Sequence, residues 1–184
     1  RQSSEIEWYI STRAAFRKTF GIPTDAFVAG IISRIAPEKN IVFLAQAAAV
    51  FLTKKKNAWF VVVGDGPSLD EIKNIFRAAN VENRLVCTGS LKDKQLVNAY
   101  HALNVFAFAS HSETQGLVLA ESMAAGTPVV AVDAPGVREV VKDQINVRLI
   151  PRDNVGQFVQ ALQWMADLSA SKTAAMRRNA RKTA

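Results

Sequence analysis

Residues 104–121 read NVFAFASHSETQGLVLAE, an apolar run followed by a polar turn and a second apolar segment. The run 104–109 has the length and composition of a buried strand. Gly116 is placed to open the helix that follows, so Ser110 to Gly116 occupies the turn at the carboxyl end of the strand. Open α/β sheets bind their ligands at such turns. This stretch therefore predicts an α/β fold with a binding crevice at one edge of its sheet.

Strands and helices alternate outward from this stretch, between about residue 26 and residue 170. The alternation predicts a Rossmann-like, doubly wound parallel sheet of about six strands with helices on both faces. Helices over 41–52, with Asn40 as N-cap, and 155–166 repeat apolar residues along one face and should pack on the sheet. The expected strands are 27–32, 59–63, 85–88, 105–109, 128–132 and 147–150.

The 184 residues suit one domain with two flanking segments. Residues 1–24 are a polar, amphipathic lead-in that ends in a helix stop signal, and residues 25–170 form the sheet domain. Residues 171–184 are a basic, helical tail. Because the chain begins at Arg1, we expect it to be part of a longer protein.

Composition excludes several classes of function. No run approaches the roughly 20 apolar residues of a membrane span, and no secretory signal is visible. Cys87 stands alone in an apolar strand, which favours a buried thiol in a reducing, cytoplasmic compartment. The net charge of +7 lies largely in residues 54–56 and 177–182, where no aromatic residues interleave, so nucleic acid is not an expected partner.

Two glutamates, Glu113 and Glu121, stand eight residues apart on either side of Gly116. The first amides of the helix, those of Leu117 and Val118, lack intrahelical partners and favour an anion such as phosphate. Carboxylates would repel a phosphate but accept well from neutral hydroxyls beside it. A nucleoside diphosphate sugar offers both groups, whereas the alternative is a pair of solvated surface acids.

Two cations follow the first strand in SRIAPEKN, residues 33–40. Arg34 leaves the carboxyl end of the strand and Lys39 precedes the next helix, so both can face the crevice. A guanidinium and an ammonium are suited to a diphosphate that no metal holds. Two ordinary surface cations are the alternative interpretation.

Gly64 and Gly66 follow the second strand in the sequence GDGP. A dinucleotide fingerprint would need glycine at Leu69, so a nicotinamide dehydrogenase is disfavoured. The glycines instead let the backbone turn close to a nucleoside or form a plain tight turn, with Pro67 at the first helical position. His111 is near enough to touch a donor sugar or is structural, His101 is a packing residue, and no cluster has metal-ligand spacing.

Taken together, SRIAPEKN, VVVGDGP, RLVCTGSL, ASHSETQGLVLAESMAAGTPVVA and GVREVV resemble, in order, the C-terminal nucleotide-sugar-binding domain of the retaining glycosyltransferases of family 4, which have the GT-B fold. The resemblance covers about residues 25–150. It implies that Arg34 and Lys39 hold the diphosphate and that Glu121 binds the ribose. It also implies that Glu113 meets the donor sugar, helped by the backbone amides of residues 115–118, from Gln115 to Val118.

The resemblance implies transfer of a sugar from a UDP-sugar or GDP-sugar to an acceptor hydroxyl, with Arg34, Lys39 and Glu113 as catalytic residues and no metal. An N-terminal domain outside this chain would bind a glycan or glycolipid acceptor, so this chain should bind the donor without turnover. A peripheral membrane role of the full-length enzyme, at the inner face, stays open. The alternatives are a non-catalytic binding module, a GT-B-fold epimerase, and a glycoside hydrolase that uses both glutamates but gives the two cations no role.

Overall fold

Six strands form one parallel sheet in the computed structural model of this chain, which describes residues 2–111, 116–138 and 147–183. Their order across the sheet is β3-β2-β1-β4-β5-β6. Each is a nearly continuous apolar run, because helices cover both faces of the sheet. The expected strands are confirmed, with bounds that differ by no more than one residue. They are β1 (Phe27–Ile32), β2 (Ala58–Val63), β3 (Leu85–Gly89), β4 (Val105–Phe108), β5 (Val129–Val132) and β6 (Val147–Ile150).

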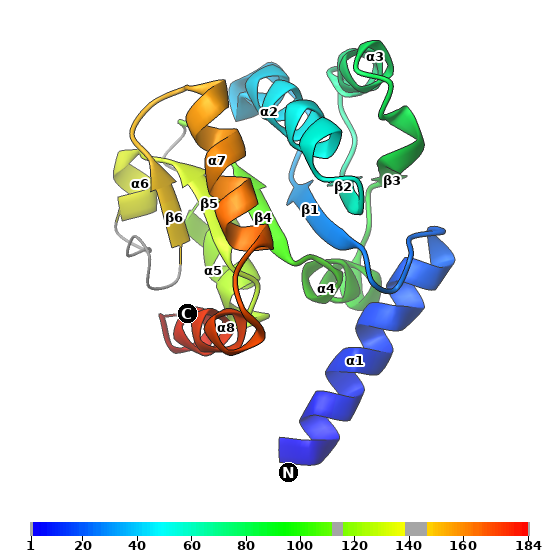
Figure 1. Ribbon diagram of the computed structural model, residues 1–184, viewed down its shortest axis with the longest axis vertical. Helices are drawn as coiled ribbons and strands as arrows, with labels where there is room; N and C mark the ends of the chain where they lie inside the picture. The colour runs from blue at the N-terminus through cyan, green and yellow to red at the C-terminus, as the bar shows by residue number, and fades with distance from the viewer. Residues whose placement is uncertain (1, 112–115, 139–146, 184) are drawn as a thin grey trace.

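The helices form a layer on each side of the sheet (Figure 1). In one layer α2 packs against α3 and α7, and in the other α5 packs against α8 while α1 packs against α4. Both flanking segments of the chain therefore contact the sheet domain. The helices are α1 (Gln2–Thr19), α2 (Ile41–Lys54), α3 (Leu69–Ala78), α4 (Asp93–Ala102), α5 (Gly116–Ala124), α6 (Pro135–Arg138), α7 (Val155–Ala166) and α8 (Ala170–Thr183), with short 3₁₀ turns η1 (Pro37–Lys39) and η2 (Glu82–Arg84).

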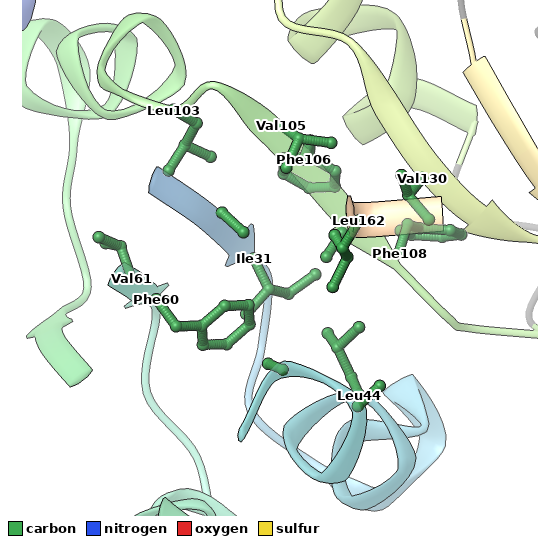
Figure 2. Close-up of a cluster of buried hydrophobic side chains, with 14 of the residues drawn as sticks. Ile31, Leu44, Phe60, Val61, Leu103, Val105, Phe106, Phe108, Val130 and Leu162 are labelled. Atoms are coloured by element: carbon green, nitrogen blue, oxygen red, sulfur yellow. The ribbon is translucent and has the colours of Figure 1, made fainter. Parts of the chain in front are cut away.

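Part of the hydrophobic core lies between the sheet and the layer that contains α2 and α7. Figure 2 draws Leu44 of α2 and Leu162 of α7 in one cluster with side chains of β1, β2, β4 and β5. Leu44 is 1% exposed and Leu162 is 0% exposed. Burying such a side chain stabilises the fold by about 1.5–3 kcal/mol. The helical spacing predicted for these two elements is confirmed.

A buried arginine joins α1 to the amino end of the sheet. Arg17 is 1% exposed and donates to the carbonyl oxygens of Ala26 at 2.8 Å and Ala102 at 3.1 Å. It also donates to the carbonyl oxygen of Thr24 at 2.9 Å and to Oδ1 of Asn104 at 2.8 Å. This role of Arg17 was not predicted from the sequence. The division of the chain at residue 24 stays a prediction, but α1 carries a side chain that is built into the sheet domain.

Two helix starts differ from the sequence prediction. Asn40 precedes α2 in the left-handed conformation, with φ of 55°, and its side chain does not cap the helix. Instead Nδ2 donates to the carbonyl oxygen of Ala109 and to the carboxylate of Asp153. Pro67 lies before α3, which begins at Leu69, rather than at its first position. At Asn40, contacts with residues that follow β4 and β6 occupy the side chain in place of the helix amides. Before α3, the N-cap residue Ser68 donates its amide to the carbonyl oxygen of Ile35 at 3.0 Å.

The C-terminal helix α8 folds back onto this domain. Met176 is 4% exposed and Ala180 is 0% exposed, and Arg177 donates to the carbonyl oxygen of Gly126 at 3.4 Å. Trp164 of α7 is half-buried beneath the guanidinium of Arg148, 5.3 Å from its ring centroid. Within residues 2–111, 116–138 and 147–183, no helix has the length and apolar character required to cross a membrane.

Candidate functional site

The strand order reverses direction between β1 and β4. From β1 the chain continues outward to β2, whereas from β4 it continues to β5 on the other side. At such a switch point the loops at the carboxyl ends of the two strands diverge and leave a crevice that binds ligands. The loop after β1 carries Arg34 and Lys39, and the segment after β4 carries His111 and leads to α5. The candidate residues from both stretches therefore follow adjacent strands.

Arg34 is available to a ligand at little cost. Its Nε lies 3.5 Å from Oε1 of Glu38, and the two side chains are 67% and 55% exposed. An ion pair this exposed contributes about 0–1 kcal/mol, so the guanidinium can turn towards a stronger anion. Lys39 is half-buried at the end of η1.

The loop after β1 contacts the residues that follow β4 through hydrogen bonds of Glu38 and Asn40, the neighbours of Lys39 in the sequence. Ser110 Oγ donates to the carbonyl oxygen of Glu38 at 3.5 Å, and Asn40 Nδ2 donates to that of Ala109 at 3.2 Å. The structure thus brings Lys39 beside the end of β4, as the crevice requires. Arg34 joins the same group through its ion pair with Glu38.

The two glycines after β2 permit close contact with the loop after β1. Gly64 has φ of +135° and Gly66 has φ of +157°, conformations that L side chains rarely adopt. A Cβ at Gly64 would overlap the carbonyl oxygen of Ser33, and one at Gly66 would overlap that of Ile35. A hydrogen bond of 3.0 Å from the amide of Ile35 to the carbonyl oxygen of Asp65 closes the same contact. The packing of these two loops therefore requires glycine at both positions, whether or not a nucleoside binds nearby.

A pocket of about 420 Å³ opens at the carboxyl ends of β1, β2 and β3. It brings Arg34 and Gly64 together, whereas Gly66 is not among its lining residues. The residues that the loop after β3 and helix α4 contribute to this pocket were not predicted, although the strand end in RLVCTGSL signalled that region. The lining residues are Ile32, Ser33, Arg34, Val63, Gly64, Asp65, Ser90, Leu91 and Leu96.

An aspartate that the sequence analysis missed joins three strand ends. Asp153, in the loop between β6 and α7, lies 3.1 Å from Nε2 of His111 and accepts from Asn40 Nδ2 at 3.0 Å. His111 is 56% exposed in its side chain, so its imidazole is accessible to solvent at the carboxyl end of β4. Asp153 comes soon after the end of β6, as Arg34 does after β1, and this position could have marked it as a candidate site residue. This contact joins the segment after β4 to the loop after β6, 42 residues away in the chain.

The second half of the glutamate run lies on α5, and the first half is outside the described residues. Glu113 and Gln115 belong to residues 112–115, of which the structure describes nothing. Gly116 begins α5, so the amides of Leu117 and Val118 lie in its first turn as expected. Glu121 is exposed one turn further on and accepts a hydrogen bond of 2.8 Å from Oη of Tyr100.

The pKa values of two neighbouring residues of α4, Tyr100 and His101, shift in opposite directions. Burial, and then the hydrogen bond and charge of Glu121, raise the pKa of Tyr100, which therefore stays a protonated donor. Burial, and then the charges of Arg177 and Arg181, lower the pKa of His101. His101 is half-buried against the edge of the Trp8 ring, 5.1 Å between centroids, so it is a packing residue as predicted.

Metal-ligating side chains do not gather in the described part of the chain. No group of three His, Cys, Asp or Glu side chains there is arranged to hold an ion. Cys87 is half-buried, and burial raises the pKa of its thiol. A reaction without a metal stays a prediction.

Residues 12–183 match the family model described as glycosyl transferases group 1. The chain is 34% identical over 140 residues to alpha-monoglucosyldiacylglycerol synthase of Streptococcus pneumoniae, which covers 75% of this chain and 32% of that enzyme. It is 32% identical over 162 residues to D-inositol 3-phosphate glycosyltransferase of Mycolicibacterium smegmatis, which covers 85% of this chain and 36% of that enzyme. The chain thus spans about a third of the length of these curated relatives.

Solved structures share the fold over nearly the whole chain. Anabaena HepE in complex with UDP and glucose gives a TM-score of 0.80 at 27% identity, over 94% of this chain and 46% of that one. The C-terminal domain of a glycosyl transferase group 1 family protein, LpcC of Francisella tularensis, gives 0.81 at 25% identity, over 93% of this chain and 90% of that one. The predicted Rossmann-like sheet, one half of a GT-B fold, is confirmed.

Proposed function

This chain belongs to the glycosyl transferases group 1 family, and on that premise we propose that it is the C-terminal, donor-binding domain of a retaining GT-B glycosyltransferase of family 4. The full enzyme transfers a sugar from a nucleoside diphosphate sugar to an acceptor hydroxyl. One observation carries the proposal: Arg34, Lys39 and the first turn of α5 follow the two strands that flank the switch point. Two cations and a helix amino terminus favour a diphosphate there.

The chemical task of these groups is to stabilise the leaving diphosphate. When the bond between the anomeric carbon and the phosphate oxygen breaks, negative charge develops on that oxygen. Arg34, Lys39 and the amides of Leu117 and Val118 supply charge and hydrogen-bond donors for it. Removing one such donor typically lowers the rate on the order of 10² to 10³.

The glutamates bind hydroxyl groups on either side of the diphosphate. Glu121 accepts from the ribose, and Glu113 accepts from the donor sugar and orients it, with backbone amides from Gln115 onward nearby. The acceptor hydroxyl attacks on the face from which the diphosphate departs, so the anomeric configuration is retained. His111, whose Nε2 lies 3.1 Å from the carboxylate of Asp153, contacts the donor sugar in this proposal.

The nucleoside occupies the pocket at the ends of β1, β2 and β3. Its volume of about 420 Å³ is in the range of small-molecule sites, and it adjoins Arg34. Gly64 lines it, and Gly66 holds the neighbouring turn against the loop after β1. UDP-sugars and GDP-sugars are the proposed donors, and UDP is the nucleotide bound in the HepE structure.

The acceptor is bound elsewhere, by an N-terminal domain that faces this crevice in the full-length enzyme. A glycan or glycolipid is the proposed acceptor, and one relative is named alpha-monoglucosyldiacylglycerol synthase. We place the enzyme in the cytoplasm, with peripheral association at the inner face of the membrane. Without the second half of the cleft, this chain binds the donor and transfers no sugar.

A thermal-shift screen against UDP-, GDP- and ADP-sugars tests the proposal. A ligand that binds the folded state alone raises its stability by an amount that grows with the ratio of concentration to Kd. We expect one nucleotide class to raise the Tm in a concentration-dependent manner, with the free diphosphate nearly as effective as its sugar. No shift with any nucleotide at millimolar concentration would contradict the proposed function.

A further inference from the structure

A hydrogen bond joins a buried tyrosine of α4 to the exposed glutamate of α5. Tyr100 is 5% exposed, and its Oη lies 2.8 Å from Oε2 of Glu121. Burying a hydroxyl costs free energy unless it has a partner, and the carboxylate is that partner. The contact therefore connects a residue fixed in the core to one that reaches the surface of the site.

The tyrosine is held on two sides. Its ring stacks on Phe106 of β4, with 6.1 Å between centroids and 21° between planes, and Phe106 is 0% exposed. Its carbonyl oxygen accepts a hydrogen bond of 2.7 Å from Oγ1 of Thr127, which is also 0% exposed. Oη is consequently held in a nearly fixed place.

The chemistry of the pair determines which atom donates. An ionised carboxylate only accepts hydrogen bonds, so Tyr100 donates and Oε2 of Glu121 is occupied. No other side chain among the described residues hydrogen-bonds Glu121, which leaves Oε1 for a hydroxyl group of a ligand. Burial and the charge of Glu121 raise the pKa of Tyr100, so the phenol keeps this proton at neutral pH.

We propose that Tyr100 is a positioning residue that fixes Glu121 for a ribose hydroxyl and so sets the preference of the site for ribonucleotides. A free glutamate loses rotamer entropy when a ligand fixes it, and one that is already fixed loses less. The inference rests on the proposed function, because Glu121 meets a ribose only if the site binds a nucleotide. Tyr100 would then influence which pentose the site accepts in the nucleotide without itself contacting the ligand.

The test compares UDP with 2′,3′-dideoxy-UDP by calorimetry on the 184-residue chain. Tyr100→Phe removes one hydroxyl and keeps the ring. We expect it to weaken UDP binding about threefold to tenfold, the cost of ordering one rotamer-rich side chain when the ligand binds. Binding of the dideoxy nucleotide should change less than about twofold. Tyr9→Phe removes the other tyrosine hydroxyl of the chain, in α1, and should bind both ligands like the parent.

A double-mutant cycle separates positioning from general structural damage. In a Glu121→Ala background, Tyr100→Phe should cause no further loss of UDP affinity. Glu121→Gln keeps an acceptor for Tyr100 and should lose less affinity than Glu121→Ala, which keeps the test informative if Tyr100→Phe folds poorly.

Three results would overturn the inference. The first is that Tyr100→Phe binds UDP as tightly as the parent does. The second is that it weakens the binding of UDP and of the dideoxy nucleotide equally. The third is that Tyr100→Phe lowers UDP affinity as much in the Glu121→Ala background as in the parent. If the parent binds UDP and discriminates against the dideoxy form, such a result removes Tyr100 and leaves the proposed function standing. If the parent binds no nucleoside diphosphate, the proposed function fails, and the ribose role of this pair fails with it.

Discussion

Replacing Arg17 with methionine should destabilise the chain by about 2–4 kcal/mol. The substitution keeps an unbranched stem and removes the donors to the carbonyl oxygens of Ala26 and Ala102. Each buried acceptor left unpaired costs about 1–3 kcal/mol, which gives about 2–6 kcal/mol for the two. Removing a buried cation also removes its desolvation cost, so the lower part of that range applies. Oδ1 of Asn104 keeps a hydrogen bond of 2.7 Å from the amide of Val28 and adds little.

The assay is urea unfolding at pH 7, followed by circular dichroism. Lys18→Met is the matched control, because Lys18 is the exposed neighbour of Arg17 in α1 and its loss should change stability by less than about 0.5 kcal/mol. We also expect faster proteolysis within α1 in Arg17→Met, since that helix loses its attachment to the amino end of the sheet. A loss below about 1 kcal/mol, or one equal to that of Lys18→Met, would refute the claim that Arg17 fixes α1 to this domain.

Three further predictions concern the site and the helices around it. Glu121→Ala should weaken binding of the nucleoside diphosphate by about 1.5–3 kcal/mol in calorimetry, and equal affinity would argue against a ribose contact. Gly64→Ala should destabilise the chain by about 2–4 kcal/mol in urea, since it adds both backbone strain and overlap with a carbonyl oxygen, whereas Gly156→Ala in α7 should be neutral or stabilising. His101 has a lowered pKa when folded, so the unfolded chain binds more protons as pH falls through about 6.5 and stability declines there. His101→Gln should lose less stability between pH 7 and pH 5, and parallel profiles would show that another group is responsible.

The sequence predicted the secondary structure well because each signal is local. Parallel strands buried on both faces read as short apolar runs, which is why the strand from Phe27 to Ile32 was predicted at its observed bounds. The face of α2 was predicted from its spacing for the same reason. Where a loop contact competed with a local preference, the prediction was wrong: Asn40 bonds Ala109 and Asp153 across the crevice and leaves the amino end of α2 uncapped by its side chain.

Those residues of the candidate site that lie close to the ends of strands could be predicted from the sequence. Arg34 and Lys39 were placed in the crevice because each follows a strand or precedes a helix at the edge that binds ligands. The partners of these residues were not predictable in this way. Tyr100 and Glu121 are 21 residues apart, and Asp153 is 42 residues from His111, so no local pattern links them.

By itself the sequence determined the α/β class, the order of the elements and the identity of the residues at the carboxyl ends of the strands. Those properties depend on hydrophobic periodicity and on residues near one another in the chain. The tertiary structure decided which side chains make the long-range contacts. Arg17 binds the amino end of the sheet, Asp153 accepts from Asn40 of the loop after β1, and Tyr100 donates to Glu121. Such contacts exist only once the crossovers set the strand order and the helices pack, because a buried polar group then takes the partner that packing brings within hydrogen-bond distance.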